Sequence, residues 1–211
     1  LGARPIDPDT RHSDEKKLIN VVEEMSIASG IPAPQLYVLD KEEAINAFVA
    51  GFRPSETVLV VTHGTLKKLD RDELQGVIAH ELGHITGGHI LRYGEGMAAA
   101  SRISLLSMIA GIGAALAGAG DAAMGIMMAG QQAAMGNFLS FSRTQESSAD
   151  FAGAQYLSDA GISGRDSLEF FGKLLNQEYR YSRSQSEEAG FNRTHPLSGD
   201  RIARLREVYE K

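Results

Sequence analysis

The 211-residue sequence contains no cysteine, and this absence excludes disulfides, thiol catalysis and thiolate metal ligands. Any metal must therefore be held by histidine and carboxylate side chains. No run of basic residues occurs either, and the net charge is -6 with a pI near 5.5. Such a chain lacks the electrostatic attraction that nucleic acid or an anionic lipid surface would require, so we expect neither as a partner.

The length favours a single domain spanning residues 1–211, with room for one sizeable core and an inserted segment. That segment is residues 97–136, which are rich in alanine, glycine and methionine and predict a helical hairpin. The chain opens at Leu1 rather than at methionine, so we expect a trimmed or mature form with a signal or anchor upstream.

Helical periodicity is clear from Ser13, where apolar residues recur on one face until Gly30 and a following proline end the pattern. Three short stretches rich in β-branched and aromatic residues then predict strands at 35–39, 45–50 and 57–62. Together they predict a small sheet of about three strands.

The next helix has a strong start signal, because the carboxylate of Asp70 can cap its first turn while Glu73 reaches back, as in a capping box. This helix contains the stretch "DRDELQGVIAHELGHITGG". Further helices are expected over 137–157, 164–179 and 198–211. The predicted fold class is therefore α+β and mainly α, with the small sheet beside the histidine-containing helix.

That helix contains the pattern HExxH. His80 and His84 are four residues apart, so they project from one helical face and can hold one zinc ion. Glu81 lies about 100° round from His80, close enough to reach a metal-bound water without ligating the metal. Gly83 leaves space for another backbone or the metal. The spacing suits a metallopeptidase in which the ion activates water and the glutamate transfers its proton to the leaving amine.

A catalytic zinc usually has a third protein ligand, and several residues compete for that role. His89 follows beyond the "GG" that ends the helix, and we interpret it as a polar residue at the helix end; His63 and His12 are isolated. The better candidates are Glu146 and Asp150, which share a helix face four residues apart. Glu146 could ligate the metal, and Asp150 could accept the other ring N–H of the first histidine and fix its tautomer.

Four ordered stretches, "INAFVAG", "LDRDELQGVIAHELGHITGGH", "FSRTQESSADFAGAQYL" and "THPLSGDRI", resemble motifs of the HtpX-like and CAAX-prenyl-protease-like zinc metalloendopeptidases of the gluzincin group. The resemblance runs from about residue 21 to the C-terminus. It implies a gluzincin fold with one zinc ion per chain, held by His80, His84 and Glu146. It also implies Glu81 as general base and acid, and Asp150 behind the first histidine.

The resemblance further implies that His195 hydrogen-bonds the oxyanion of the tetrahedral intermediate. A structural role at the entry to the last helix is the alternative for this residue. Arg143 could orient the ligating glutamate or meet the substrate. Asn46, Ala47 and Phe48 look like the family's sheet edge beside the cleft, where an extended substrate could add as a strand.

Residues 103–120 form an uncharged run of 18 residues, the lower limit for a spanning helix. Four glycines and two serines weaken its insertion into a membrane, and Gln131 and Gln132 interrupt the second arm. The sequence therefore favours a tightly packed soluble hairpin near the active site over membrane insertion. In that position the hairpin could act as a lid or plug.

The expected function is zinc-dependent endoproteolysis of misfolded or unassembled cell-envelope proteins, with extended polypeptide as the partner. The expected location is the periplasm of a bacterial cell envelope, where a segment missing from this chain could provide membrane association. A chaperone or assembly factor that uses the same groove with latent proteolysis is the second hypothesis. A membrane-embedded peptidase is the third. The sequence does not indicate the oligomeric state.

Overall fold

The structure, a computed structural model, describes residues 2–51, 56–165, 167–172, 195 and 199–209. The chain divides into two compact units. The sheet-bearing unit comprises Leu1–Ile90 and Glu146–Lys211, and the hairpin unit comprises Leu91–Gln145. The sheet-bearing unit contains the predicted HExxH helix, and the fold class is α+β and mainly α, as predicted.

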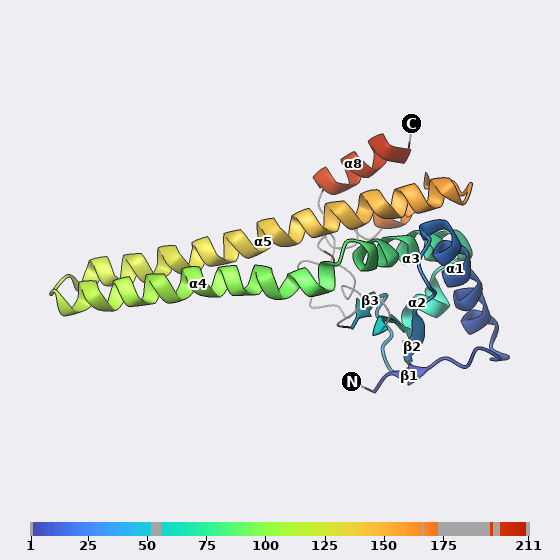
Figure 1. The fold of residues 1–211 in the computed structure, drawn as a ribbon, viewed down its shortest axis with the longest axis horizontal. Helices are drawn as coiled ribbons and strands as arrows, with labels where there is room; N and C mark the ends of the chain where they lie inside the picture. The colour runs from blue at the N-terminus through green and yellow to red at the C-terminus, as the bar shows by residue number, and fades with distance from the viewer. Residues whose placement is uncertain (1, 52–55, 166, 173–194, 196–198, 210–211) are drawn as a thin grey trace. The chain divides into compact units, whose positions relative to one another are not determined.

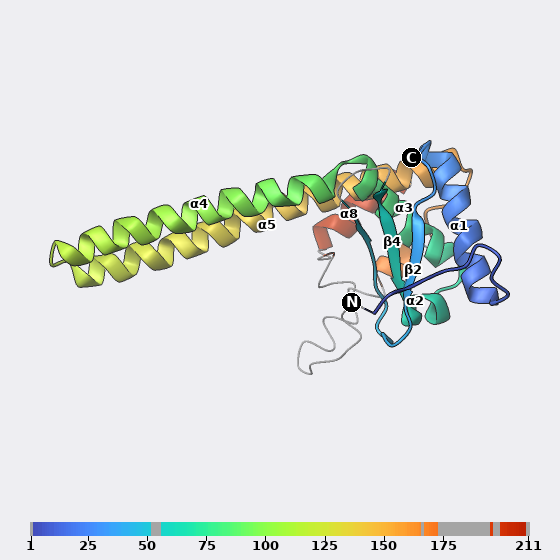
Figure 2. The same ribbon diagram turned by 60° about the horizontal axis from the view of Figure 1, so that its bottom comes forward.

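The sheet has four strands in the order β1-β2-β4-β3. Strands β2 (Gln35–Leu39), β3 (Ala47–Ala50) and β4 (Val58–Thr62) correspond to the three predicted strands. β4 pairs in parallel with β2 and antiparallel with β3, and Figure 2 shows β2 and β4 side by side. The fourth strand, β1 (Arg4–Pro5), was not predicted, because two residues of the N-terminal arm carry no alternating pattern.

Helix α1 (Ser13–Ser29) packs against α3, and both supply the core that backs the sheet (Figure 1). α1 ends at Gly30, which adopts the left-handed conformation with φ 71°, as its place after the apolar pattern suggested. The apolar face that the periodicity predicted is buried, and its residues are Leu18, Val21, Val22 and Met25.

Helix α3 (Arg71–Thr86) begins with the predicted capping box. The Asp70 carboxylate accepts a hydrogen bond from the backbone N–H of Glu73, and the Glu73 side chain accepts one from the backbone N–H of Asp70. Every residue of α3 from Leu74 to Ile85 is buried, so the HExxH segment is a core helix. A short helix, α2 (His63–Lys68), precedes it and was not predicted.

The remaining helices are α4 (His89–Leu116), α5 (Gly120–Asp159) and α8 (Gly199–Tyr209). The sequence suggested that a new helix starts near residue 137, whereas α5 continues without a break from the hairpin unit into the sheet-bearing unit. Residues 165 and 167–172 are helical as expected, and the rest of the predicted helix at 164–179 lies outside the described residues.

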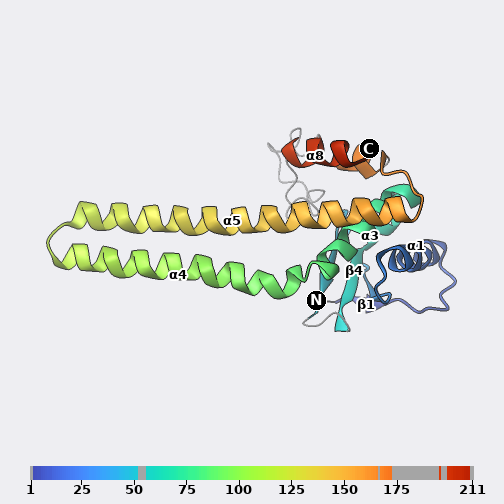
Figure 3. The ribbon, with the colours of Figure 1, turned by 45° about the horizontal axis from the view of Figure 1, so that its top comes forward.

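Within the hairpin unit, α4 and α5 run side by side in opposite directions (Figure 3). They approach closely at glycines: a Cβ on Gly96 would lie 2.5 Å from the Phe141 ring, and one on Gly130 would lie 1.9 Å from Ser107 Cβ. The large apolar side chains of the hairpin are mostly exposed, including Leu106 at 66% and Leu116 at 85%. The hairpin therefore has small residues at its helix interface, where the helices pack closely, and large apolar residues outside.

Candidate metal centre

Helix α3 directs His80 and His84 to the same point. Their Nε2 atoms lie 3.0 Å apart, and both side chains are buried. Glu146, on the part of α5 in the sheet-bearing unit, places Oε2 3.3 Å from His80 Nε2 and Oε1 3.4 Å from His84 Nε2. Residues 62 positions apart thus meet because two helices cross there.

The crossing is close because small residues meet at it. A Cβ on Gly83 would lie 2.6 Å from the carbonyl oxygen of Ala149, and one on Gly153 would lie 3.0 Å from the backbone of Ala79. Side chains at either glycine would push α3 and α5 apart. The two glycines therefore set the distance between the histidines and the glutamate, as the sequence suggested for Gly83.

His195 also enters this cluster. Its Nδ1 lies 3.3 Å from His80 Nε2 and 3.3 Å from each carboxylate oxygen of Glu146. Its Nε2 lies 3.2 Å from the carbonyl oxygen of Ala47 on β3 and 3.2 Å from Glu81 Oε1. If Nδ1 supplies a lone pair to a cation, Nε2 carries the proton and donates it to the Ala47 carbonyl oxygen.

The four side chains His80, His84, Glu146 and His195 offer donor atoms that all lie within 4.8 Å of one another. The contacts between them are 3.0–3.4 Å. Four ligands at the usual 2.0–2.1 Å from a tetrahedral zinc ion would lie about 3.3 Å apart, so the donor set fits that ion in number, chemistry and spacing.

Behind the first histidine lies a buried carboxylate, Asp150, which is paired with the guanidinium of Arg201. His80 Nδ1 is 2.9 Å from Asp150 Oδ1. Arg201, on α8, donates from Nε to Asp150 Oδ2 at 2.5 Å and from Nη2 to Asp150 Oδ1 at 2.7 Å. Its Nη1 also lies 3.1 Å from Glu146 Oε2. The sequence reading missed Arg201, although it lies within the "THPLSGDRI" stretch.

These partners set the charges of the site. Burial lowers the pKa of His80, but hydrogen bonds to Asp150 and Glu146 outweigh it and raise the pKa to about 9. Burial, followed by repulsion from His80, lowers the pKa of His84 to about 2. Burial would raise the pKa of Glu146, yet hydrogen bonds from His195 and His80 hold it well below its usual value. Burial likewise opposes ionisation of Asp150, and the bond from Arg201 overcomes it and lowers the pKa to about 2.

Glu81 is the second carboxylate of the site, and it is completely buried. Neither of its oxygens accepts a hydrogen bond from the described part of the chain, although His195 Nε2 is 3.2 Å from Oε1. Burial raises its pKa above the usual value. A carboxylate with a raised pKa and free acceptor capacity is chemically suited to take a proton.

The structure places the other predicted residues as follows. Arg143 is exposed and belongs to the hairpin unit, and the guanidinium that contacts Glu146 is that of Arg201. β3 is an edge strand, so Ala47 and Phe48 lie on the sheet edge. Asn46 precedes β3, and Thr62 and Thr65 already bond its backbone N–H and carbonyl.

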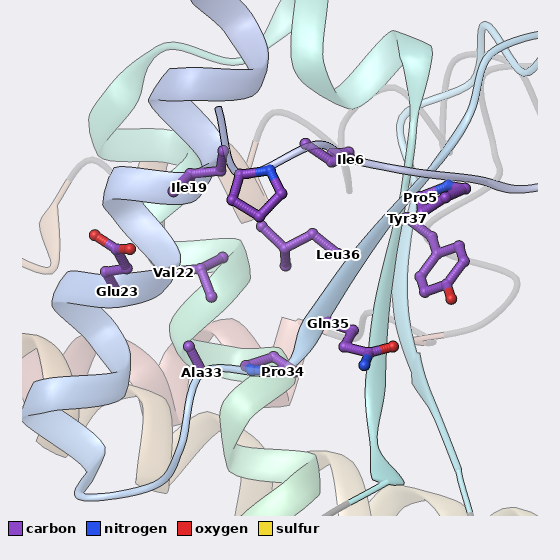
Figure 4. Close-up of a pocket in the computed structure, with 11 residues that line it drawn as sticks. Pro5, Ile6, Ile19, Val22, Glu23, Ala33, Pro34, Gln35, Leu36 and Tyr37 are labelled. Carbon is purple, nitrogen blue, oxygen red and sulfur yellow. The ribbon is translucent and has the colours of Figure 1, made fainter. Parts of the chain in front are cut away.

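A pocket of about 410 Å³ lies elsewhere in the sheet-bearing unit, between the N-terminal arm, α1 and β2 (Figure 4). Its walls are mostly apolar and include Ile19, Val22 and Leu36, with Tyr37 and Gln35 at the strand. None of the candidate metal-centre residues lines it.

Two histidines of an HExxH helix and a glutamate from a second helix, with a buried carboxylate behind the first histidine, could hold a metal ion in the manner of a metallohydrolase. Comparison with known sequences gives the family. The model of peptidase family M48 matches residues 12–209, and the chain belongs to this family.

The chain is 30% identical to a "Protease HtpX homolog" of Desulfatibacillum aliphaticivorans over 90% of the chain and 67% of that protein. Homologues with the same name from Caldanaerobacter subterraneus and Dictyoglomus thermophilum are 43% and 57% identical. Those matches cover 43% and 32% of this chain, but only 29% and 22% of the relatives' own lengths. The resemblance to HtpX-like metalloproteases inferred from the motifs is confirmed.

Proposed function

We propose that the chain is a zinc-dependent endopeptidase that cleaves extended or unfolded polypeptides of the bacterial cell envelope. One observation carries the proposal: donor atoms of His80, His84 and Glu146 converge with tetrahedral spacing beside the buried Glu81 carboxylate, which accepts no hydrogen bond from the described residues. The relatives named as proteases support the same reaction.

Zinc bound there would lower the pKa of a coordinated water and polarise the scissile carbonyl. Glu81 takes the proton of the attacking water and returns it to the leaving amine, which its raised pKa favours. Asp150, held by Arg201, keeps the Nε2 lone pair of His80 directed at the metal position. His195 supplies an N–H to the oxyanion when its ring faces the substrate.

The edge strand supports recognition of an extended substrate. β3 has β4 on one side, and its other edge is open among the described strands. A peptide added there would be bound mainly through its backbone, so cleavage would be broad in sequence. His195 already contacts the Ala47 carbonyl, so an incoming strand would compete with this imidazole.

The position of His195 also favours low resting activity, which is the feature of the second candidate function, a chaperone with latent proteolysis. A catalytic zinc keeps one position open for water, whereas His195 brings a fourth donor atom into the cluster. Cleavage then requires that the imidazole leave this place. A chaperone would retain its holdase activity after Glu81→Gln and would cleave nothing under any condition.

The hairpin supports contact with a membrane, the third candidate. Among the described residues, α4 is long and apolar enough to cross a bilayer: its 28 residues span about 42 Å, and only 6% of its most apolar window is buried. Small residues between the helices and large apolar residues outside are typical of helices in lipid. The sequence favoured a soluble hairpin over membrane insertion, but the exposure of the large apolar residues favours insertion. We therefore propose that the hairpin unit enters the bilayer.

The experiment that tests the peptidase proposal compares cleavage of unfolded β-casein by the zinc-loaded wild type and by Glu81→Gln. We expect cleavage that a chelator abolishes and zinc restores, and its loss in Glu81→Gln while one zinc per chain remains bound. The matched control is Glu42→Gln, an exposed carboxylate away from the centre, which should cleave as the wild type does. Unimpaired cleavage by Glu81→Gln would remove Glu81 from its role.

A further inference from the structure

His89 lies against the metal ligand His84, on the side opposite the donor cluster. Its Nδ1 is 2.9 Å from Nδ1 of His84, and the two rings meet edge to face with centroids 4.9 Å apart. Both imidazoles are buried, His89 at 6% exposure and His84 at 8%. The sequence suggested that His89 is a polar residue at the helix end, and the structure instead gives it a contact with the centre.

Two adjacent glycines make this contact possible. On a continued helix, His89 would lie about 140° round from His84 and would point elsewhere. Gly88 has φ +63°, a left-handed conformation that ends α3 and redirects the chain. The His89 ring then lies against Gly87, where a Cβ would be only 2.2 Å from its Nε2. Each residue of the stretch "GGH" thus has its own part in the contact: Gly87 leaves space for the ring, Gly88 turns the chain, and His89 supplies the imidazole.

The contact has a definite chemical consequence once a cation is bound. His84 directs Nε2 at the donor cluster, so its proton must be on Nδ1. That N–H is buried and needs an acceptor, which the Nδ1 lone pair of His89 provides at 2.9 Å. The arrangement parallels that of His80, whose Nδ1 faces Asp150. Here, however, the partner is a neutral imidazole.

We propose that His89 is a positioning residue that fixes His84 in its metal-binding tautomer and ring orientation. The inference rests on the proposed metal centre, and it adds a partner for the second histidine. Partners of this kind typically contribute 10–100-fold to metal affinity, so we expect His89 to contribute within that range.

The test measures zinc affinity by competition with a chromogenic chelator at pH 7.5. We expect His89→Leu, which fills space without accepting a hydrogen bond, to weaken zinc binding about 10–100-fold. His89→Asn places an amide oxygen near the position of Nδ1 and should retain affinity within about threefold of the wild type. His63→Leu, a half-buried histidine outside the centre, is the matched control and should bind as the wild type does.

Melting temperatures measured in chelator show whether the metal-free variants are as stable as the wild type. His84→Ala should abolish tight zinc binding. Failure of the wild type to bind zinc would overturn the metal centre itself. If His89→Leu binds zinc as tightly as the wild type does while His84→Ala does not bind it tightly, the role of His89 alone would be overturned. If His89→Leu does not fold, nitrogen-15 NMR of the zinc-loaded wild type replaces it, and a His89 ring protonated on Nδ1, which could not accept the His84 N–H, would contradict the proposal.

Discussion

Arg201 grips Asp150 with two nitrogens, Nε at 2.5 Å from Oδ2 and Nη2 at 2.7 Å from Oδ1. Both side chains are buried, at 5% and 6% exposure, and they lie 51 positions apart in the sequence. A bidentate pair fixes the plane of the carboxylate as well as its charge. The orientation of the His80 imidazole therefore depends on a residue of the last helix.

The first prediction concerns this pair. Arg201→Lys keeps the charge but cannot form the two-pronged bond, so Asp150 loses its fixed plane. We expect zinc affinity to fall about 10–100-fold, as for other partners of metal ligands. Chelator competition measures it, and Arg204→Lys, an exposed arginine on the same helix, is the control. Equal affinities in the two variants would show that the fork is not needed.

The second prediction concerns the crossing of α3 and α5. Gly83→Ala puts a Cβ 2.6 Å from the Ala149 carbonyl oxygen, so the helices must separate. We expect a loss of about 1–3 kcal/mol in the free energy of unfolding, measured by urea denaturation without metal, together with weaker zinc binding. Gly136→Ala, in open space on α5, should be neutral or stabilising. Wild-type stability in Gly83→Ala would contradict the close approach.

Local signals in the sequence were sufficient for much of the fold. The capping box of Asp70 and Glu73 defined the start of α3, and the apolar pattern before Gly30 defined α1, because both depend on residues a few positions apart. Two short elements were missed for the opposite reason. α2 has six residues and β1 has two, which is too few for a periodic pattern.

The residues of the candidate site likewise fall into those that local spacing identifies and those that only packing brings together. HExxH is local, so His80, Glu81 and His84 could be identified from spacing. The positions of Arg201 and His89 depend on packing that spacing does not contain: one side chain comes from a distant helix, and the other is turned back by two glycines. The "GG" signal was visible, but it indicates a helix end without showing where the next ring will lie.

The third prediction concerns His195. As an oxyanion donor, it should contribute about 100- to 1,000-fold to kcat, so His195→Ala should lower kcat by that factor with little change in KM. Steady-state cleavage of a fluorogenic peptide by the zinc-loaded enzyme measures both constants. A higher kcat in His195→Ala would contradict the donor role, and would show instead that the fourth donor atom restrains the enzyme.

The fourth prediction concerns stability in acid. Burial would raise the pKa of Glu15, but hydrogen bonds from Thr10 and Arg4 outweigh it and lower the pKa below its usual value of 4.5. The stabilisation is therefore fully present above about pH 4.5 and is lost as the pH falls through the lower, folded-state pKa. Glu15→Gln should destabilise the protein by about 1–3 kcal/mol at pH 7.

The variant should also lose less stability than the wild type as the pH falls from 6 towards 3, because glutamine has no charge to lose. Urea denaturation at each pH measures the difference. Glu23→Gln, an exposed position on the same helix, should follow the wild-type curve. A difference between wild type and Glu15→Gln that does not change with pH would show that the carboxylate charge is unimportant.

The fifth prediction concerns the apolar surface of the hairpin unit. Leu106 and Ile109 are 66% and 59% exposed on α4, and we expect them to enter lipid. The affinity of the double variant Leu106→Glu/Ile109→Glu for neutral phosphatidylcholine vesicles should fall by about tenfold or more, because charged side chains are costly in the bilayer core. Flotation on a density gradient measures the bound fraction.

The control variant Ile27→Glu replaces an isoleucine that is 83% exposed on α1. It should leave vesicle binding unchanged, because the sheet-bearing unit has no part in the proposed contact. Equal flotation of the double variant and the wild type would show that the exposed apolar residues of α4 do not enter lipid.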